Sequence, residues 1–363
     1  MAKAASKSQR FRGTLLGGAV GDALGAAVEF MSRTEILAWF GAQGIRDFVP
    51  VDGRLGAITD DTQLTAFCAE ALLRAPAAGV ERDDTANHAL ERSRSYLRWL
   101  LTQRETHALL DAPRSWLMGE PDLFHRRGPG RTCLSALSAM PALGTSAANA
   151  SKGCGGVMRV APIGLLHSHW HEESEHFDAR VFAAGVHDAA LTHGHASGHL
   201  PAGFLALLVA LVVAGVPLER ALERARRQLL IRPRHEETAA AVDRALFLAR
   251  ADPWQPAQLA ALGYGWVGEE ALAMALYCAV GCALTGHDLE RAVVLAVNHD
   301  GDSDSTGAIT GSLLGALHGE QAIPARWLDA VELRQTVTTL ADDLADVPDW
   351  QPGSAAHRRY GGG

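Results

Sequence analysis

The chain has 363 residues, of which 48% are hydrophobic and 20% are charged, and this is enough apolar material to bury a large core without a partner. Its formal net charge of −8 at pH 7 and the lack of a long basic run argue against nucleic-acid binding. The densest basic stretch, residues 224–234, follows Glu223 and mixes arginine with leucine and isoleucine, which predicts the solvated face of an amphipathic helix.

Five cysteines are scattered along the chain, and neither their odd number nor their spacing fits a disulfide framework or a zinc site. Two of them, Cys278 and Cys282, lie four residues apart in an apolar segment. This spacing places both on one helix face and favours core packing over metal ligation. Because free thiols are typical of a reducing compartment, we expect a cytoplasmic protein.

Most segments repeat their apolar residues every three or four positions, which predicts an all-α protein. No Pro-rich or Ser-rich linker divides the middle of the chain. We therefore expect one compact multi-helix bundle over residues 10–350, with flexible ends at residues 1–9 and 351–363. Two apolar stripes with helical spacing are Leu64, Phe67, Cys68, Ala71 and Leu72, and Ile309, Leu313, Ala316 and Leu317.

The first predicted helix carries a glycine stripe. Residues 1–10 are polar and basic, but no long apolar signal core follows them, because glycines and Asp22 interrupt the next segment. Gly17, Gly21 and Gly25 recur every four residues there, and without a Cβ they allow another backbone to approach closely. We expect Asp22 to form structural hydrogen bonds rather than to act in catalysis.

Two acidic motifs, residues 59–62 and 302–306, stand immediately before predicted helices. Such residues are often only caps, and the helix dipole stabilises first-turn carboxylates by about 0.3–1 kcal/mol each. A cap needs one acceptor, however, whereas the two motifs supply four carboxylates and several hydroxyl groups. All-oxygen ligands suit Mg²⁺ or Mn²⁺ rather than zinc. The separation of about 240 residues leaves open whether the motifs meet.

Residues 151–156 are rich in glycine, and their backbone N–H groups could bind phosphate oxygens in a concave nest. A tight turn before the next apolar segment is the alternative interpretation. His193, His195 and His199 follow, with spacings that indicate a zinc site only weakly.

An uncharged segment at residues 200–218 is the longest apolar stretch. Prolines and glycines leave only residues 204–214 uninterrupted, about half of the roughly 20 residues that a bilayer requires. We therefore expect a buried core helix and no membrane segment.

Taken in chain order, these motifs resemble those of the ADP-ribosylglycohydrolase family, and the resemblance extends over almost the whole chain. One such motif would be a weak signal, whereas five in the same order are a strong one. The matching segments are residues 17–25 followed by Glu29, Thr59-Asp60-Asp61-Thr62, residues 153–160, residues 192–195 and residues 302–306.

The resemblance implies a compact helical bundle with two Mg²⁺ or Mn²⁺ ions in a cleft. Matched by position, the metal ligands would be Thr59, Asp60, Asp61, Asp302, Asp304 and Ser305. The family commonly has threonine at the last of these positions, so the hydroxyl group of Thr306 is the alternative to that of Ser305.

The resemblance also implies the residues that act on the substrate. Glu29 and Asp304 would be catalytic, with Glu29 near the ribose as either an acid or a base, although an exposed and inert glutamate is the alternative. Tyr264 or Trp266 could stack on adenine or pack against the following helix. The residues matched to diphosphate contacts are Ser151, Gly153, Cys154, Gly155 and Gly156, and His193 is matched to a position beside ADP-ribose. Cys154 replaces the asparagine of some relatives.

By this resemblance the chain is a metal-dependent hydrolase that removes ADP-ribose from a modified protein or small molecule. An N-glycosidic bond to arginine or another guanidine is favoured, and an O-glycosidic bond to serine is possible. Two alternatives remain: an ADP-ribose-binding relative without catalysis, and a different dinuclear-metal hydrolase such as a nucleosidase.

Overall fold

The computed structural model describes residues 5–82, 84–111, 114–286 and 288–361. Within these residues the chain forms seventeen α-helices and six short 3₁₀ helices, and only two isolated β-bridges, so the predicted all-α class is confirmed. The α-helices are α1 (Lys7–Gly25), α2 (Arg33–Phe40), α3 (Asp60–Ala77), α4 (Thr85–Thr102), α5 (Arg131–Ser138), α6 (Ala161–His167), α7 (Glu175–Ala190), α8 (Ala196–Val213), α9 (Leu218–Leu230), α10 (Glu236–Ala251), α11 (Pro256–Ala260), α12 (Gly268–Thr285), α13 (Leu289–Val297), α14 (Ser303–His318), α15 (Ala325–Ala330), α16 (Arg334–Asp346) and α17 (Ala355–Gly361). The 3₁₀ helices are η1 (Leu117–Gly119), η2 (Pro121–Phe124), η3 (Cys154–Gly156), η4 (Ser168–Trp170), η5 (Glu320–Ala322) and η6 (Val347–Asp349).

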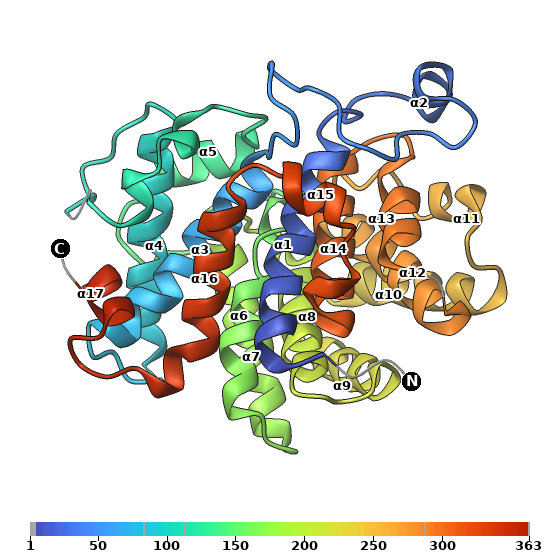
Figure 1. Cartoon of the computed structure of the whole chain (residues 1–363). Coiled ribbons are helices and arrows are strands. Elements are labelled where there is room, and N and C mark those ends of the chain that lie inside the picture. The colour runs from blue at the N-terminus through green and yellow to red at the C-terminus, as the bar shows by residue number, and fades with distance from the viewer. Residues whose placement is uncertain (1–4, 83, 112–113, 287, 362–363) are drawn as a thin grey trace.

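Helices α1 and α14 cross the middle of the molecule side by side and in opposite directions (Figure 1). Their backbones touch along a line that we call the glycine seam. A Cβ atom at Gly17 would lie 2.3 Å from the carbonyl oxygen of Gly311, and one at Gly21 would lie 2.0 Å from that of Gly307. Only glycine permits this approach, so the glycine stripe of the sequence finds its partner in α14. The seam pairs Gly13 with Gly315, Gly17 with Gly311, Gly21 with Gly307, and Gly25 with Ser303.

Helix α1 also fixes the start of α3. The fully buried carboxylate of Asp22 accepts hydrogen bonds from the backbone N–H groups of Thr59 and Thr62, each at 3.0 Å, and from the Thr62 hydroxyl group. These bonds satisfy donors that the first turn of a helix leaves without a partner. The predicted structural role of Asp22 is therefore confirmed, and α1 joins the N termini of α3 and α14.

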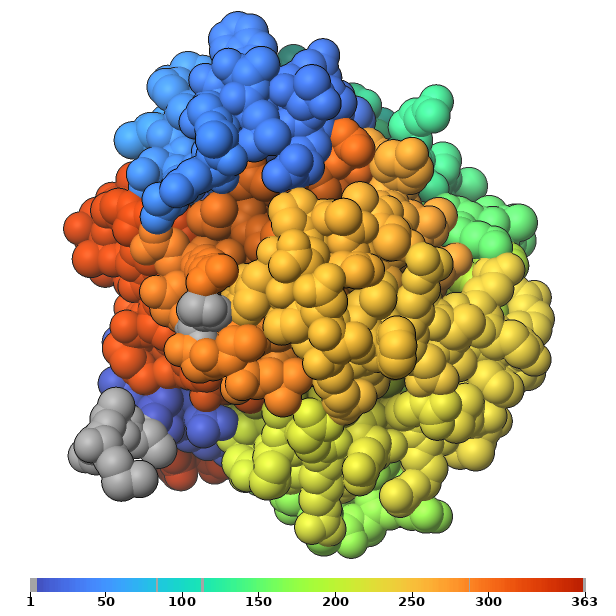
Figure 2. Space-filling model, turned by 90° about the vertical axis from the view of Figure 1, so that its right-hand side faces the viewer, coloured from blue at the N-terminus to red at the C-terminus, as the bar shows by residue number. Residues whose placement is uncertain are grey.

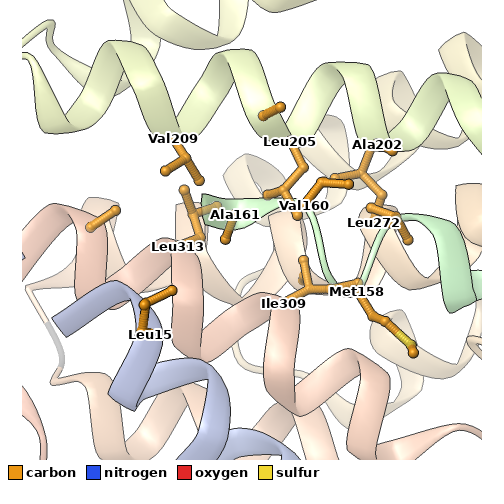
Figure 3. Packing of buried hydrophobic residues seen from close by; sticks show 14 of the residues in the cluster. Leu15, Met158, Val160, Ala161, Ala202, Leu205, Val209, Leu272, Ile309 and Leu313 are labelled. Carbon is orange, nitrogen blue, oxygen red and sulfur yellow. The ribbon is translucent and has the colours of Figure 1, made fainter. Parts of the chain in front are cut away.

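The longest apolar helices form the core beneath this junction. By length and composition α8 and α12 could each cross a membrane, but 94% and 72% of the residues in their apolar windows are buried inside the protein. Figure 3 shows Leu205 and Val209 of α8 facing Ile309 and Leu313 of α14, with Leu272 of α12 beside them. The predicted buried core helix is confirmed.

The remaining sequence predictions about packing are confirmed with one exception. All five residues of the apolar stripe in α3 are buried, as are Cys278 and Cys282. The basic stretch in α9 is not uniformly solvated, however. Arg224 is only 5% exposed and pairs with Asp178 of α7 at 2.6 Å, because this ion pair attaches α9 to the neighbouring helix.

Both ends of the described chain contain helices, and the flexibility expected for residues 1–9 and 351–363 stays a prediction. Helix α1 begins at Lys7, and Ser6 and Gln9 form a capping box at its start. Within the C-terminal segment, α17 buries Tyr360, whose hydroxyl group donates to Asp343 at 2.7 Å and whose ring stacks on Trp350. These contacts attach α17 to α16 and to the segment at Trp350.

The segment between α1 and α3 lies at one end of the bundle. It carries the short helix α2, and Figure 2 shows it (blue) above the face formed largely by residues 218–300 (yellow to orange). This placement matters because Glu29 lies at this end of the bundle, together with the end of the glycine seam where Gly25 meets Ser303.

Adding one methyl group at Gly17 tests the close approach of the two backbones at the glycine seam. Helical Gly→Ala normally stabilises by about 0.5–1 kcal/mol, but in Gly17→Ala the two backbones must separate, so we expect a loss of about 1–3 kcal/mol in unfolding free energy. Urea unfolding followed by circular dichroism measures this. Gly119→Ala is the control, because a Cβ there meets no atom within 4 Å. A Gly17→Ala protein as stable as the parent would contradict the close approach.

Candidate active site

A cavity of about 530 Å³ opens where the ends of α1, α3 and α14 meet. Seven separate segments of the chain line it, so it exists only in the folded protein. Its lining residues are Glu29, Phe30, Asp60, Asp61, Gly128, Pro129, Gly130, Arg131, Thr132, Cys133, Gly153, Cys154, Gly155, Met158, His193, Trp266, Asp302, Asp304 and Ser305.

The two acidic motifs converge in this cavity. Thr59 is the N-cap of α3 and Asp302 is the N-cap of α14, so both helices direct their N termini toward the same place. The Thr59 side chain accepts from the N–H of Asp61 at 3.3 Å and forms a hydrogen bond with the carboxyl group of Asp304. The question that spacing alone left open is answered: the motifs from the two ends of the chain are in contact.

Burial and mutual repulsion disturb every carboxyl group of the cluster. Burial, together with nearby carboxylates, raises the pKa values of Asp60, Asp61 and Asp302 well above the ordinary range. Burial raises the pKa of Glu29 to about 10, with the charge of Asp304 as the next cause. The pKa of Asp22, buried beneath them, rises to about 7 for the same two reasons. The fold thus gathers negative charge that it does not itself neutralise.

The donor set fits hard divalent cations. The Oδ1 atom of Asp61 is buried and has no hydrogen-bond partner, which is costly unless something else binds it. Its neighbours are carboxylate and hydroxyl oxygens, the ligands that Mg²⁺ and Mn²⁺ prefer. A cation in this cavity would satisfy the orphaned atom and relieve the repulsion.

The structure distinguishes the two hydroxyl groups at the end of the second motif. Thr306 directs its hydroxyl group to backbone carbonyls, donating to Ala296 at 2.8 Å and to Asp302 at 2.9 Å, and the residue is fully buried. Ser305 lines the cavity, with its hydroxyl oxygen 3.7 Å from the sulfur of Met158. Of the two, only Ser305 presents its hydroxyl group to the site.

A second group of potential metal ligands lies elsewhere, and the sequence did not reveal it. Atoms of Asp122, His125 and Glu332 all lie within 4.8 Å of one another. Arg54 lies 2.7 Å from Asp122 and 3.2 Å from Glu332, and Arg127 also pairs with Glu332. Because arginines already neutralise these carboxylates, the group is better described as an ion-pair network.

The glycine-rich segment lines the same cavity as the acidic cluster. Gly153, Cys154 and Gly155 line the cavity, whereas Ser151 lies at its edge and bonds to Thr132 at 2.9 Å. Gly156 packs behind the wall, where a Cβ would lie 2.6 Å from the carbonyl oxygen of Gly198.

Two contacts hold this segment in place. The N–H of Cys154 donates to the carbonyl oxygen of Trp266 at 3.2 Å, and the guanidinium of Arg159 donates to that of Gly155 at 3.0 Å. The thiol of Cys154 donates to Asp302 at 2.9 Å. The residue that departs from the family pattern therefore contacts the acidic cluster directly.

The three histidines of residues 193–199 do not form a zinc site. His193 is buried with its Nδ1 atom 2.8 Å from the Thr192 hydroxyl group, and burial lowers its pKa to about 3, so its ring is neutral. His195 caps α8, and His199 bonds to the backbone of His193. Only His193 lines the cavity, as the resemblance implied.

An aromatic pair stands at the cavity. Trp266 lines it and stacks on Phe30, with ring centroids 5.3 Å apart and an angle of 23° between the planes. Tyr264, the other aromatic suggested by the sequence, is 59% exposed and lies outside the lining. The sequence analysis missed Phe30 because no motif marks this residue, although it directly follows Glu29.

The sequence analysis also missed the loop at residues 128–132. Its Gly130 N–H donates to the carboxylate of Asp60 at 3.1 Å, and the preceding carbonyl of Arg127 accepts from the N–H of Asp60. Arg131 brings a positive charge to the cavity wall. The Gly-Pro-Gly sequence was the available signal, because such a run marks a turn that can approach other groups closely.

An all-α protein in which two helix N termini present carboxylates to a cavity beside a glycine-rich segment has the architecture expected of the glycosidase class that the sequence resembles. A model of this class, ADP-ribosylglycohydrolase, matches residues 3–353. The chain therefore belongs to the ADP-ribosylglycohydrolase family and is an enzyme that hydrolyses ADP-ribosyl linkages.

Known relatives agree over nearly their whole length. The chain is 26% identical to "ADP-ribosylhydrolase ARH3" of Bos taurus, over 95% of each chain. It is 25% identical to "ADP-ribosylarginine hydrolase Tri1" of Pseudomonas putida, over 93% of this chain and 78% of that protein. A solved "ADP-ribosylglycohydrolase-related protein complex" superposes with a TM-score of 0.64 at 26% identity, covering 98% of this chain and 99% of the other. The family resemblance read from the sequence is confirmed.

The raised pKa values predict how stability depends on pH. The folded protein without cations holds protons that the unfolded chain releases above pH 4 to 5, so its stability should fall as the pH rises through about 7 and toward 10. Added Mg²⁺ should reverse this loss, by about 2.7 kcal/mol at a hundredfold excess over Kd. Thermal unfolding at pH 5 and pH 8, with EDTA or Mg²⁺, measures both effects. Equal stability in all four conditions would contradict the charge crowding.

Proposed function

We propose that the enzyme releases ADP-ribose from an N-glycosidic bond to arginine or a similar guanidine, with two Mg²⁺ or Mn²⁺ ions. One observation carries the proposal: carboxylates from both ends of the chain meet in one cavity, where an aspartate oxygen is left without a partner. An O-glycosidic bond to serine is the second candidate, because metal ions that orient the ribose do not by themselves select the acceptor atom.

The ions would be held by oxygen atoms from both motifs. When bound, they would act as Lewis acids that orient the ribose hydroxyl groups beside the scissile bond. The proposed ligands are Thr59, Asp60, Asp61, Asp302, Asp304 and Ser305, of which all but Thr59 line the cavity.

Glu29 and Asp304 would carry the chemistry of the ribose. Hydrolysis forms a bond between the anomeric carbon and a water oxygen, breaks the bond to the leaving nitrogen, and transfers one proton to that nitrogen. Glu29 would exchange this proton, either with the leaving group or with the attacking water. Asp304, buried among the other carboxylates, would stabilise the positive charge that develops on the ribose ring.

The remaining walls suit the rest of ADP-ribose. Phosphate oxygens would meet Gly155 and its neighbours Ser151, Gly153, Cys154 and Gly156, with Arg131 across the cavity as a positive group. The adenine would stack on the aromatic pair of Trp266 and Phe30. The neutral ring of His193 would contact the sugar without adding charge.

The carboxyl group of Glu29 favours a guanidine as the leaving group. The bound cations would neutralise the aspartates of the cavity, which leaves Glu29 to pair with the guanidinium of an arginine side chain, whereas serine would bring no cation. The relative Tri1 is named for arginine. The acceptor would be an ADP-ribosylated protein or small molecule, and the five free cysteines favour a reducing, cytoplasmic setting.

A substrate panel tests the reaction. The protein is incubated with peptides ADP-ribosylated on arginine or on serine, with Mg²⁺ or EDTA, and products are identified by mass spectrometry. We expect free ADP-ribose from the arginine peptide with Mg²⁺, at least a hundredfold less with EDTA, and equally little from Asp304→Ala, because loss of a ligand removes several kcal/mol of transition-state stabilisation. Asp329→Ala, a change of an exposed aspartate, is the control. Full activity of Asp304→Ala would refute the metal assignment, and release from serine alone would refute the arginine preference.

Glu29→Gln separates catalysis from binding. The amide keeps the shape but cannot exchange a proton, so we expect kcat to fall by about 10²–10⁴ while KM changes little. Steady-state kinetics on the arginine substrate give both constants. Glu236→Gln, at an exposed position on α10, should match the parent. A Glu29→Gln enzyme with unchanged kcat would leave this glutamate without a catalytic role.

A further inference from the structure

A second cavity of about 330 Å³ lies among α3, α4, α6 and α7, and it shares no lining residue with the active site. Its volume is within the range of small-molecule sites. Leu72, Leu166, Trp170 and Val347 supply most of an apolar wall. A ligand that fills it must therefore have an apolar body.

The polar part of the lining is basic. Apart from Thr85, it consists of three arginines and three histidines, and the described lining residues include no carboxylate. Arginine and histidine side chains supply N–H donors, which suit an oxyanion better than a cation. The residues are Arg82, Arg92, Arg180, His88, His167 and His187.

Two of these groups are buried with polar atoms left unsatisfied. His167 is 9% exposed, and its Nδ1 atom has no hydrogen-bond partner. Arg92 is 4% exposed, and its Nε atom likewise has none, lying 3.6 Å from Asp188 in an ion pair too long for a hydrogen bond. Burial, followed by the arginine charges around it, lowers the pKa of His167 to about 3. An oxyanion that draws these two side chains toward the cavity would give both atoms a hydrogen-bond partner.

We propose that this cavity binds a small molecule with an apolar body and one oxyanion group, either a carboxylate or a phosphate. The apolar walls would hold the body, and Arg92 and His167 would hold the oxyanion. The site is independent of the ADP-ribose site in its residues.

The cavity is nevertheless connected to the active site through buried contacts. Asp188, the partner of Arg92, accepts a hydrogen bond from Nε of Arg159 at 3.1 Å. Arg159 in turn donates to the carbonyl oxygen of Gly155 at 3.0 Å and to the hydroxyl group of Thr192, which contacts His193. An anion that draws Arg92 away from Asp188 therefore changes the charge balance at Arg159, which holds the glycine-rich segment. Occupancy of the second cavity should alter the KM for the ADP-ribosylated substrate, and this consequence alone rests on the proposed function.

Binding is tested by calorimetry on the whole protein with four probes. Hexanoate and phenyl phosphate carry both an apolar body and an anion, whereas hexanol lacks the anion and inorganic phosphate lacks the body. At least one of the first two should bind about tenfold or more tightly than the last two, since a charge-assisted hydrogen bond is worth about one such factor. The stronger of the two identifies a carboxylate or a phosphate ligand. Equal binding of hexanol, or no binding of either anion, would overturn the proposal.

Variants locate the bound probe. Ala184→Phe fills the cavity and keeps every charge, so it should abolish binding, and Arg92→Gln should weaken it by about tenfold. Arg244→Gln, on the exposed face of α10, is the matched control and should bind as the parent does. Because Arg92 also pairs with Asp188, circular dichroism checks that its variant folds. Undiminished binding by Ala184→Phe would overturn the assignment to this cavity.

The connection between the second cavity and the active site is tested separately by enzyme kinetics. Saturating the bound probe should shift the KM for the arginine substrate at least twofold in the parent and leave it unchanged in Ala184→Phe. Binding without such a shift in an active enzyme would retain the site and overturn the connection. If the protein has no hydrolase activity at all, the calorimetric result still decides the binding proposal, so the two failures can be told apart.

Discussion

The contact of two backbones along the glycine seam governs the rest of this structure. Because α1 and α14 carry glycine opposite glycine at three successive turns, the two ends of the chain can lie closer than side chains would allow. Asp22, on the same helix, then ties the start of α3 to the seam. Three helix termini are fixed relative to one another in this way, and the acidic motifs at two of them have no freedom to separate.

Holding the two acidic motifs together costs electrostatic free energy, and the folded protein sustains this cost. Carboxyl groups that would ionise freely in water are buried side by side, and their pKa values rise accordingly. Helix N termini offset only part of this cost, because their dipoles contribute about 0.3–1 kcal/mol each. A protein tolerates such a conflict where function requires it, and divalent cations are the species whose charge and ligand preference resolve it.

The sequence predicted the class of fold, the buried core helix and the members of the acidic cluster, because each of these leaves a local pattern. The glycine stripe at Gly17 and Gly21 predicted the close approach of another backbone, but the stripe alone does not identify which helix packs against it. The loop around Gly130 and the ring of Phe30 were missed, because only tertiary contact gives them a role. For the same reason, Ser305 and Thr306 look equivalent in the sequence and differ in the structure.

The central claim is that carboxylates from the two ends of the chain bind divalent cations together. Anomalous diffraction from a crystal soaked in manganese tests it most directly. The account predicts strong peaks between Asp60 and Asp61 of α3 and Asp302 and Asp304 of α14. Absence of any peak there, or a peak only at Asp122 and its neighbours, would contradict it.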